Sequence, residues 1–403
     1  MNILPEPLPT LRVAVVGGGI GGLATAAFLH QAGQHVTVFE QAPSLKGVGA
    51  GLVMAPNAMR LLRRMGVMEQ VLTTGVRLET GWEFRRWSDG TILSAEDLDV
   101  RCAELYGEDT YVLHRADLLA AIRSAVPEGI VRLGSHVGSV AQSTHGVSLV
   151  LADGSVHEAD VLIGADGVHS VVRGTIAAPT PAEYSGMCAF RALVPAERAP
   201  EFARRPAQTL WIGPDRHLVH YPICGGRQVN LVAFAPAGNF KRESWTAVAE
   251  LEEFLAEFAG WDPRLEALIR AADRPGRWAL LDRQPLTQWT AGRISLLGDA
   301  AHPMFPFFAQ GAAQSLEDAA VLATCLTRHA EDPQRGLVEY ESLRIGRTTK
   351  MQQLSRARKD INHLHDGTEQ EQRDAQLADG DPLAQAGWIY GYDAELAATK
   401  ALV

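Results

Sequence analysis

The sequence contains little cysteine, and its cysteines are not spaced for metal binding. Only four occur in 403 residues, and no two of them form a Cys-x-x-Cys pair. Structural zinc sites and redox-active thiol pairs usually show that spacing. A small secreted protein held together by disulfides would contain a higher share of cysteine. The sequence therefore indicates reduced thiols, no metal site and a cytoplasmic location.

Positive charge and long apolar runs are also scarce. The chain has 37 Lys and Arg against 47 Asp and Glu, a formal net charge of −10, which argues against a nucleic-acid partner because such proteins present a basic surface. Residues 13–29 are apolar, but five glycines interrupt them, and a membrane helix needs about 20 residues. The first ten residues contain three prolines and lack the pattern of a signal peptide. We expect no membrane span.

What remains is the composition of a globular protein, with 46% hydrophobic and 21% charged residues. A chain of this length can form two or more domains. Residues 12–41 predict a buried strand, a glycine-rich turn, a helix and a second strand, which together make one βαβ unit. Residues 82–93 and the surroundings of Asp153 and Gly154 predict two hairpins.

The second half of the chain changes character twice. From about residue 183 to 281, alternating patterns predict strands, with one helical stretch within 244–260. From residue 310 onward the pattern is mainly helical, except that the polar residues 366–381 predict an exposed connector. We therefore predict an α/β protein in which a sheet-rich domain is inserted into a Rossmann-type domain, followed by a C-terminal helical segment.

The glycine-rich turn of the βαβ unit matches a dinucleotide-binding pattern. Gly17, Gly19 and Gly22 fit G-x-G-x-x-G between the strand and the helix. The first glycine permits the tight turn, the second lets a pyrophosphate approach the backbone, and the third lets helix and strand pack closely. Glu40 ends the next strand, where its carboxylate can accept hydrogen bonds from ribose hydroxyls. The turn predicts a site for FAD or NAD.

Two further motifs follow strands later in the chain. The segment "IGADGVHSVVR" contains Asp166, and "LLGDAAHP" contains Asp299 and His302. Together with the glycine turn they form an ordered set of three motifs, G-x-G-x-x-G, D-G-x-x-S-x-x-R and G-D. Over nearly its whole length the chain resembles single-component FAD-dependent aromatic hydroxylases of the para-hydroxybenzoate hydroxylase class. The nearest resemblance is to 6-hydroxynicotinate 3-monooxygenase, 3-hydroxybenzoate 6-hydroxylase and salicylate hydroxylase.

The resemblance implies which residues hold FAD. Arg115, in "HRADLL", corresponds to an arginine near the flavin chain, and the Asp166 segment serves both the flavin and the nicotinamide nucleotide. Asp299 is expected to hold the ribityl hydroxyls. Gly311 and Ala312 are expected to begin a helix whose positive N-terminal end faces the flavin ring. The expected regions are an FAD-binding domain of residues 1–74, 100–182 and 282–335, a substrate domain of residues 75–99 and 183–281, and a C-terminal helical region of residues 336–403.

The resemblance also implies an oxygenation reaction. NADH or NADPH reduces FAD, O2 adds to give a flavin C4a-hydroperoxide, and its terminal oxygen attacks an electron-rich ring. The expected substrate is a small phenolic or hydroxy-heteroaromatic acid of the hydroxybenzoate, salicylate or 6-hydroxynicotinate type. Because a neutral ring is a poor nucleophile, a base must remove the proton of its hydroxyl group.

His217 and Tyr221 are the expected catalytic pair. Four residues apart in a strand, they lie on one face, whereas His220 points to the other face. The same His-x-x-x-Tyr pair occurs in 6-hydroxynicotinate 3-monooxygenase and 3-hydroxybenzoate 6-hydroxylase. His302 is a further catalytic candidate, which either bonds a substrate hydroxyl or shapes its loop.

The loop after Asp299 is expected to wall the reacting face of the flavin. Phe307 and Phe308, together with Phe305, are suited to an apolar wall that excludes water. Gln310 lies where a family hydroxylase places a glutamine that contacts the substrate. Each phenylalanine can equally be a part of the domain core.

Two pocket residues depart from the 6-hydroxynicotinate hydroxylases. Val53 and Phe190 stand where those enzymes carry histidine. Both changes make the expected pocket less polar, so that a benzoate-like ring fits at least as well as a nicotinate. Arg191 can meet a substrate carboxylate or lie on the surface.

Two other functions stay open on the sequence alone. A flavin oxidase or dehydrogenase on the same scaffold would act without oxygen insertion, and the Asp166 segment and the loop at His302 argue against it. A catalytically silent flavin-binding scaffold would show degraded motifs, and the motifs of this chain are intact. The basic helix around Arg344, Arg347 and Lys350 is expected to be a solvated face, or a contact in a homodimer.

Overall fold

The N-terminal βαβ unit folds as its apolar strand and glycine turn predict. In the computed structural model, which describes residues 9–45, 50–178, 182–238 and 248–400, β1 (Arg12–Val16) pairs in parallel with β2 (His35–Phe39). Helix α1 (Ile20–Gln31) connects them. The apolar residues 13–29 are thus a strand, a turn and a packed helix, and no described helix is long and apolar enough to span a membrane.

The βαβ unit belongs to a six-stranded sheet of order β18-β19-β12-β1-β2-β8. β12 pairs in parallel with β1 and with β19, which places the ends of three motif-bearing strands side by side. The other strands of this sheet are β8 (Val131–Arg132), β12 (Val161–Gly164), β18 (Thr290–Ala291) and β19 (Ile294–Leu296). A small sheet of order β11-β10-β9 contains the predicted hairpin at Gly154; its strands are β9 (Val137–Gln142), β10 (Val147–Leu151) and β11 (Val156–Ala159).

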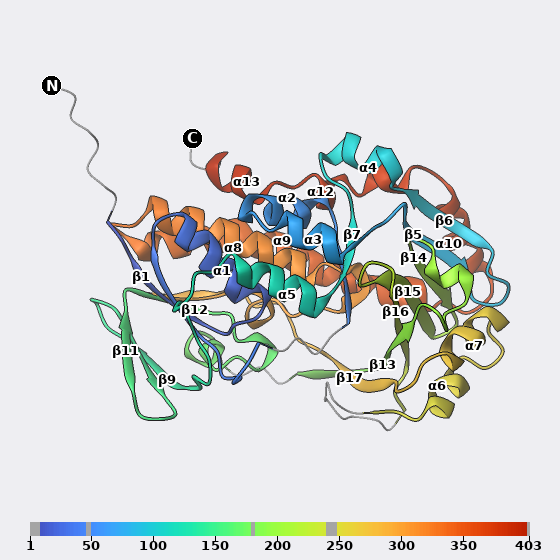
Figure 1. The fold of residues 1–403 in the computed structure, drawn as a ribbon, viewed down its shortest axis with the longest axis horizontal. Helices are drawn as coiled ribbons and strands as arrows, with labels where there is room; N and C mark the ends of the chain where they lie inside the picture. Colours follow the sequence, from blue (N-terminus) through green and yellow to red (C-terminus); the bar gives the residue numbers. More distant parts are fainter. Residues whose placement is uncertain (1–8, 46–49, 179–181, 239–247, 401–403) are drawn as a thin grey trace.

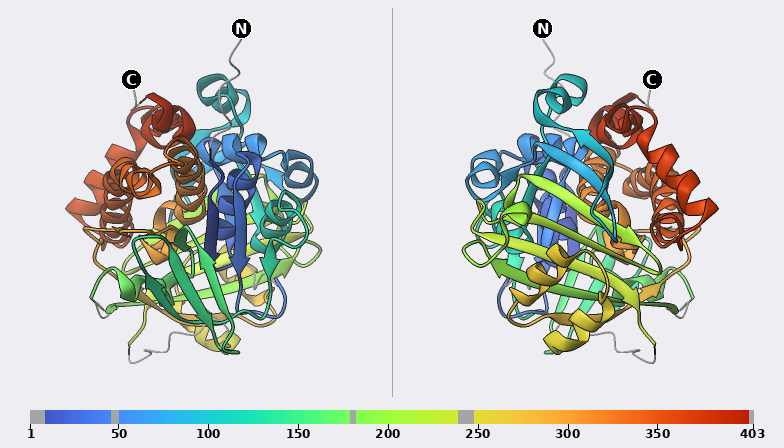
Figure 2. Two further views of the ribbon diagram at one scale, coloured as in Figure 1. Left: turned by 90° about the vertical axis from the view of Figure 1, so that its left-hand side faces the viewer. Right: turned by 90° about the vertical axis from the view of Figure 1, so that its right-hand side faces the viewer.

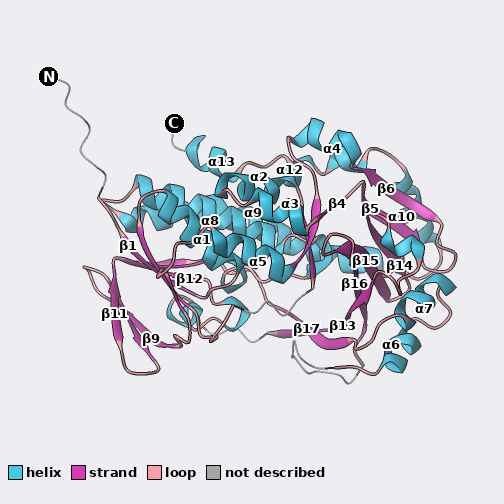
Figure 3. Cartoon of the chain, in the orientation of Figure 1, coloured by secondary structure: helices cyan, strands magenta, loops and turns pink. Residues whose placement is uncertain are grey.

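Long helices pack beside the six-stranded sheet. α8 (Gly311–Arg328) lies against α1, and α9 (Pro333–Asn362) lies against α8. Both run along the long axis of the molecule (Figure 1). Helix α9 extends to a seven-stranded sheet at the other end (Figure 3). The remaining helices of the N-terminal third are α2 (Pro56–Met65), α3 (Met68–Thr74), α4 (Asp99–Tyr106) and α5 (Arg115–Ser124).

A seven-stranded sheet of order β17-β13-β16-β15-β14-β5-β6 forms the other end of the molecule. Its strands come from two separate segments and include the predicted hairpin at residues 82–93. They are β5 (Thr80–Arg86), β6 (Ile92–Asp97), β13 (Glu183–Pro195), β14 (Ala207–Gly213), β15 (Arg216–Ile223), β16 (Gln228–Pro236) and β17 (Gly276–Asp282). One face is covered by α6 (Leu251–Glu257) and α7 (Pro263–Arg270), which lie in front of the sheet in the right-hand view of Figure 2.

The helix predicted within residues 244–260 is shorter than its pattern indicates. Helix α6 begins at Leu251, and residues 244–247 lie outside the described part of the chain. The polar residues 366–381, predicted to be an exposed connector, instead contain α10 (Thr368–Ala378). Most of these residues are exposed, as predicted, but the segment is not an irregular connector, because it forms a helix that packs against β6.

A further three-stranded sheet joins the six-stranded and the seven-stranded sheets. It consists of β3 (Gly51–Met54), β7 (Tyr111–His114) and β4 (Val76–Arg77) in the order β3-β7-β4. The backbone N–H of Gly51 donates to Asn230 Oδ1 of the seven-stranded sheet over 2.8 Å. The remaining short helices are η1 (Gly167–His169), η2 (Val172–Thr175), η3 (Glu201–Arg204), η4 (Gly298–Ala300), η5 (Pro306–Phe308), α11 (Pro382–Gln385), α12 (Gly387–Tyr390) and α13 (Ala394–Lys400).

The two arginines in the basic part of α9 do not form the solvated face that their charge suggests, whereas Lys350 is exposed. Arg344 is 0% exposed, and its guanidinium contacts Glu317 over 2.6 Å and Asp318 over 2.7 Å. Arg347 pairs with the same Glu317 over 2.8 Å. Lys350 lies over the ring of Trp388. For the two arginines that prediction was wrong because the acidic partners lie on α8, and the spacing within α9 does not reveal them.

Candidate active site

The glycine turn after β1 forms a cradle of exposed backbone. Gly17 has φ of +106°, a conformation that favours glycine, and a Cβ there would lie 2.3 Å from the carbonyl oxygen of Ala165. A Cβ on Gly22 would lie 1.9 Å from the carbonyl oxygen of Gly17, so α1 packs directly on the turn. A Cβ on Gly19 would meet no atom within 4 Å. The backbone at Gly19, which begins α1, is therefore open to a large ligand.

Glu40 braces this turn from β2. Its carboxylate accepts hydrogen bonds from the N–H of Gly18 over 2.6 Å and from the N–H of Ala42 over 2.7 Å. The side chain is only partly buried, so it keeps lone pairs for a further donor such as a ribose hydroxyl. The position suits the role expected from the sequence.

The D-G-x-x-S-x-x-R and G-D motifs are bonded to each other. The Asp166 carboxylate accepts hydrogen bonds from Ser170 Oγ over 2.5 Å and from the backbone of Val171 over 2.8 Å, so it caps its own turn. Arg173 reaches across to the other motif and donates to the carbonyl oxygens of Asp299 over 2.9 Å and Ala300 over 2.7 Å. The two motifs therefore form one unit at the ends of β12 and β19.

Asp299 lies in the short helix η4 that directly follows β19. The residue is exposed, yet the surrounding protein partly desolvates its carboxyl group, and this desolvation raises the pKa of that group. Three cations oppose that rise, in the order His302, Arg115 and Arg173. A partly desolvated carboxylate on an open wall is well placed to accept hydrogen bonds from hydroxyl groups of a ligand.

Helix α8 directs its N-terminus toward the same region. Gln310 occupies the N-cap position without a side-chain hydrogen bond to the first turn. A Cβ on Gly311 would meet no atom within 4 Å. The N–H groups of the first turn and the helix dipole can therefore act on an anionic group placed at Gly311 and Ala312. The glycine cradle, Asp299 and this helix end together fit a dinucleotide with a ring that carries negative charge when reduced.

His217 and Tyr221 project from β15 toward this unit, on the face of the seven-stranded sheet opposite to α6 and α7. The His217 ring packs on Phe234, with ring centroids 4.5 Å apart, and edge-on against Phe307 at 5.0 Å. His220 lies on the other face, where its Nε2 accepts a hydrogen bond from Trp211 Nε1 over 3.2 Å. The predicted orientation of the three side chains is therefore what the structure shows.

His217 has a partner that the sequence did not indicate. Its Nδ1 lies 2.7 Å from Nε2 of His363, the residue that ends α9. Burial, followed by the neighbouring His363 and the positive charge of Arg358, lowers the pKa of His217 well below its usual range. Burial lowers the pKa of His363 to about 4. Both rings are neutral at pH 7, and a neutral imidazole can accept a proton.

The backbone carbonyl oxygen of His363 accepts from the N–H of Asp215, whose carboxylate pairs with the exposed His365 over 3.1 Å. His363 is 9% exposed, so its ring lies between the buried His217 and the surface. No spacing in the sequence relates residue 363 to residue 217, and so this residue was missed.

Tyr221 lies where the three-stranded sheet meets the seven-stranded one. A Cβ on Gly51 would come within 2.4 Å of its ring, so glycine is needed for this close approach. Val53, the predicted pocket residue, belongs to the same apolar cluster as Tyr221, Met351 and the half-buried Phe308. Burial raises the pKa of Tyr221, and its hydroxyl therefore stays protonated and able to donate a hydrogen bond.

The loop after Asp299 walls the space beside His217. Phe307 contacts His217 and Phe234, while Phe308 contacts Trp82 with ring centroids 5.9 Å apart. Gln310 is 4% exposed, and its Oε1 accepts a hydrogen bond from Asn57 Nδ2 over 3.0 Å. The structure brings the two phenylalanines to the site, whereas it holds the Gln310 amide oxygen against α2.

Phe190 does not line this pocket. It stacks on Phe254 of α6, with ring centroids 4.8 Å apart and an interplanar angle of 6°. Its neighbours in β13, Ala189 and Arg191, point to the opposite face because side chains alternate along a strand. The sequence prediction for Phe190 was wrong because it assigned the residue to the wrong face of β13.

His302 belongs to a buried ion network. Its Nε2 lies 2.5 Å from Asp318 Oδ2, and its ring packs beside Trp289. His302 and then Arg344 lower the pKa of Asp318 to about 2, which outweighs the effect of burial. Of the two roles open for His302, these contacts support the shaping of the loop.

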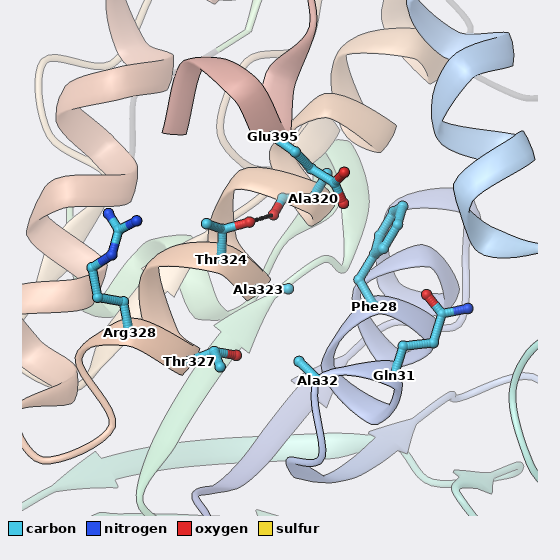
Figure 4. A pocket seen from close by; sticks show the side chains of 9 residues that line it. All are labelled: Phe28, Gln31, Ala32, Ala320, Ala323, Thr324, Thr327, Arg328 and Glu395. Atoms are coloured by element: carbon cyan, nitrogen blue, oxygen red, sulfur yellow. Dashed lines mark hydrogen bonds between the residues drawn. The ribbon is translucent and has the colours of Figure 1, made fainter. Parts of the chain in front are cut away.

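An open groove lies away from these residues. A groove of about 590 Å³ lies over α1 and the C-terminal half of α8 and is lined by Phe28, Ala320, Thr324 and Arg328, among others (Figure 4). None of the motifs or of the predicted catalytic residues contributes to it. The chemistry indicated by the side chains therefore lies between η5, β15 and α9, and this groove takes no part in it.

Known proteins resemble the chain over nearly its whole length. The family model described as FAD binding domain matches residues 10–355. A 3-amino-4-hydroxybenzoate 2-monooxygenase of Streptomyces platensis is 40% identical over 386 residues, which cover 95% of this chain and 96% of the relative. A 6-hydroxynicotinate 3-monooxygenase of Pseudomonas fluorescens is 35% identical over 385 residues, 95% of each chain. The structure of a salicylate hydroxylase substrate complex matches with a TM-score of 0.81 and 29% identity, and covers 98% of both chains.

Proposed function

We infer the function from one premise: this chain belongs to the FAD binding domain family, and its full-length relatives are flavin-dependent aromatic monooxygenases. It is a flavoenzyme of that kind, with FAD as its cofactor and NAD(P)H and O2 as co-substrates. We propose that its substrate is a small phenolic aromatic acid. The compounds after which the relatives are named share that chemistry, since 3-amino-4-hydroxybenzoate, 6-hydroxynicotinate and salicylate each combine a hydroxyl group with a carboxylate on one ring.

The residues present fit FAD. The backbone at Gly19 and Glu40 would hold the nucleotide, Asp299 and Arg115 would hold the chain that leads to the flavin, and the first turn of α8 would face the flavin ring. Bound FAD would supply the redox chemistry: it is the group that NAD(P)H reduces, and in its reduced form it activates O2 for transfer of one oxygen atom to the substrate ring. The six-stranded sheet with its helices would form the FAD-binding domain, and the seven-stranded sheet the substrate domain.

The observation that carries the proposal is the buried pair of His217 and His363 beside an apolar wall. A phenol becomes a strong carbon nucleophile when its hydroxyl proton leaves. His217 is neutral and can accept that proton, but its low pKa means that it holds the proton poorly. Transfer to His363, which is 9% exposed and so lies nearer the solvent, would keep the substrate ionised. His217 thus serves as a relay, while Tyr221 donates a hydrogen bond to the substrate oxygen.

Phe307 and Phe308 would keep water away from the reacting face. Phe307 is 3% exposed and forms the apolar wall with Phe234 and Phe305. Exclusion of water strengthens every electrostatic interaction in the site and suppresses loss of activated oxygen as peroxide. Val53 would contribute an apolar contact to the substrate ring from β3.

The experiment that tests the proposal is a substrate screen with the FAD-loaded enzyme. Salicylate, 3-hydroxybenzoate, 3-amino-4-hydroxybenzoate and 6-hydroxynicotinate are each added with NADH or NADPH in air, and NAD(P)H oxidation, peroxide and product mass are measured. We expect at least one compound to accelerate NAD(P)H oxidation and to gain one oxygen atom. Stoichiometric peroxide without a hydroxylated product from any compound would instead indicate an oxidase.

A further inference from the structure

The C-terminal half of α9 carries polar side chains on the face that covers the proposed substrate site. Met351, Ser355, Arg358 and Asn362 follow a spacing of four, three and four residues, which places them on one face of a helix. Met351 packs in the apolar cluster that contains Tyr221. The same helix contacts η5, the segment that carries the phenylalanine wall. This face of α9 is therefore directed at the site.

Three of these side chains have hydrogen-bonding groups with no partner in the described part of the chain. Ser355 and Asn362 are both 0% exposed. The Ser355 hydroxyl, both amide atoms of Asn362 and Nε of Arg358 are buried and make no hydrogen bond there. Buried polar groups almost always have partners, because an unpaired one costs about 1–3 kcal/mol. Three such groups on successive turns of one helix point to a polar ligand that completes them.

Arg358 differs from the other buried and half-buried arginines of α9. Arg344, Arg347 and Arg356 each form an ion pair with a carboxylate, at 2.6, 2.8 and 2.7 Å. Among the described residues, no carboxylate pairs with Arg358. Its guanidinium lies instead over the rings of Phe308, Phe84 and Trp82, at 4.6, 5.5 and 5.9 Å from their centroids. Contacts with aromatic faces leave the N–H donors at the edge of the guanidinium free.

The buried acid near Arg358 does not supply the missing partner. Glu96 accepts a hydrogen bond from the hydroxyl of Tyr390 over 3.2 Å. Burial raises the pKa of Glu96 to about 8, so this carboxyl group is mostly protonated at neutral pH. The positive charge of Arg358 is therefore largely uncompensated within the protein.

We propose that Arg358, assisted by Asn362 and Ser355, binds the carboxylate of the aromatic substrate. The proposal rests on the function proposed above and names the anchor for the acid group. A guanidinium matches the planar carboxylate with two parallel N–H donors, and the Asn362 amide and the Ser355 hydroxyl can donate further hydrogen bonds.

Segment η5 relates this anchor to the catalytic histidine. Phe307 contacts His217, and the adjacent Phe308 contacts Arg358. A single aromatic ring that lies along η5 would thus present its hydroxyl to His217 and its carboxylate to Arg358. Arg191, the arginine considered from the sequence, stacks on Trp278 at 4.5 Å from the ring centroid and lies on β13, on the same face of the sheet as Tyr221. It is the competing anchor.

The test compares acids with their neutral amides in the FAD-loaded enzyme. Salicylate and salicylamide, and 3-hydroxybenzoate and 3-hydroxybenzamide, are titrated by calorimetry and by the change in flavin absorbance. We expect the parent enzyme to bind each acid more tightly than its amide. Arg358→Gln should weaken acid binding about 10-fold to 100-fold, as expected for loss of a charge-assisted hydrogen bond, and should change amide binding by less than about threefold. Arg356→Gln, two residues away, is the matched control and should keep the preference.

A second variant keeps the arginine in place. Asn362→Asp has nearly the same shape and adds a negative charge beside Arg358, so it should also abolish the preference for the acid, while FAD content and amide binding are unchanged. An unchanged preference in both Arg358→Gln and Asn362→Asp would overturn the proposal. If only Arg191→Gln lost the preference for the acid over the amide, the anchor would lie on β13, and this result would also overturn the proposal.

Failure of the anchor and failure of the proposed function give different results. If phenols and amides are hydroxylated as well as acids, the anchor is wrong and the monooxygenase assignment stands. If acids bind in an Arg358-dependent manner but none is hydroxylated and only peroxide forms, the anchor is supported and the proposed function is wrong.

Discussion

At the scale of single residues, the two histidines of β15 show how the face of a strand decides the environment of a side chain. His217 faces the phenylalanine wall and pairs with His363, whereas His220 faces the opposite core and accepts from Trp211. Both are 1% exposed. They therefore have the same burial and different partners, which makes them a matched pair for experiments.

We expect His217→Asn to lower the rate of ring hydroxylation by about 100-fold or more, since a positioned base typically contributes 10²–10⁴-fold. Reduction of FAD by NAD(P)H should change much less, because this residue acts on the substrate hydroxyl. Stopped-flow absorbance for flavin reduction and product analysis for hydroxylation separate the two. His220→Gln, on the other face of β15, should keep most of the hydroxylation rate. An unchanged product yield in His217→Asn would show that the residue is not needed.

The burial of His220 predicts how the stability of the fold depends on pH. Burial lowers its pKa to about 3, from a usual value of 6.5. Between these two values the unfolded chain binds one more proton than the folded chain, so this residue stabilises the fold above pH 6.5 and loses that contribution as the pH falls toward 3. In His220→Gln, whose amide can still accept from Trp211, the decline of unfolding free energy between pH 6.5 and pH 4 should be shallower by up to about 1.4 kcal/mol per pH unit. Equal slopes in urea titrations of both proteins would contradict the prediction.

Asp299 is the residue on which retention of FAD should depend most. Asp299→Ala removes the carboxylate from the unit that the two bonded motifs form, and we expect purified protein to contain less than half of the FAD of the parent, as judged by the ratio of flavin to protein absorbance. Asp273→Ala, at a carboxylate that is 64% exposed, is the control and should retain FAD fully. Full occupancy in Asp299→Ala would count against its role.

Site residues that belong to local motifs could be predicted from the sequence, and residues that meet only through the fold could not. Gly17, Glu40 and Asp299 stand in segments whose spacing alone indicates a nucleotide cradle. His363 and Arg358 lie about 150 residues from the strand they approach, and only the packing of α9 reveals them. Phe190 was misplaced because burial does not show which face of a strand a side chain occupies.

At the scale of elements, α8 and α9 are joined by a buried ion network. Arg344 binds Glu317 and Asp318, and Asp318 also binds His302, which follows the G-D motif. The network thereby connects α9 to the loop that holds Asp299. The charge pattern of α9 alone suggested a solvated face, because a helix shows its own charges but not the acids on its neighbour.

We expect Arg344→Met to destabilise the protein by about 3–5 kcal/mol, because it leaves two buried carboxylates without their cation. Urea denaturation of the FAD-free protein measures this directly. Arg335→Met, at an exposed position of the same helix, should change the free energy of unfolding by less than about 0.5 kcal/mol. Similar losses in both variants would show that the network contributes little.

At the scale of the whole molecule, the site lies where three parts of the chain meet. The six-stranded sheet brings the motifs of residues 17, 166 and 299 side by side, the seven-stranded sheet supplies His217, and α9 covers both. The order of the motifs was sufficient to predict the α/β class and the inserted sheet. The path of α9 across the substrate side was not predictable, because its pattern specifies a helix and leaves its direction open.

The most direct test of the central claim follows oxygen from O2 into the product. The FAD-loaded enzyme is supplied with NAD(P)H, isotopically labelled O2 and the acid that most accelerates NAD(P)H oxidation, and the product is analysed by mass spectrometry. An aromatic monooxygenase should place one labelled oxygen atom on the ring for each NAD(P)H consumed in coupled turnover. Label found only in peroxide or water, with the aromatic acid recovered unchanged, would contradict the account.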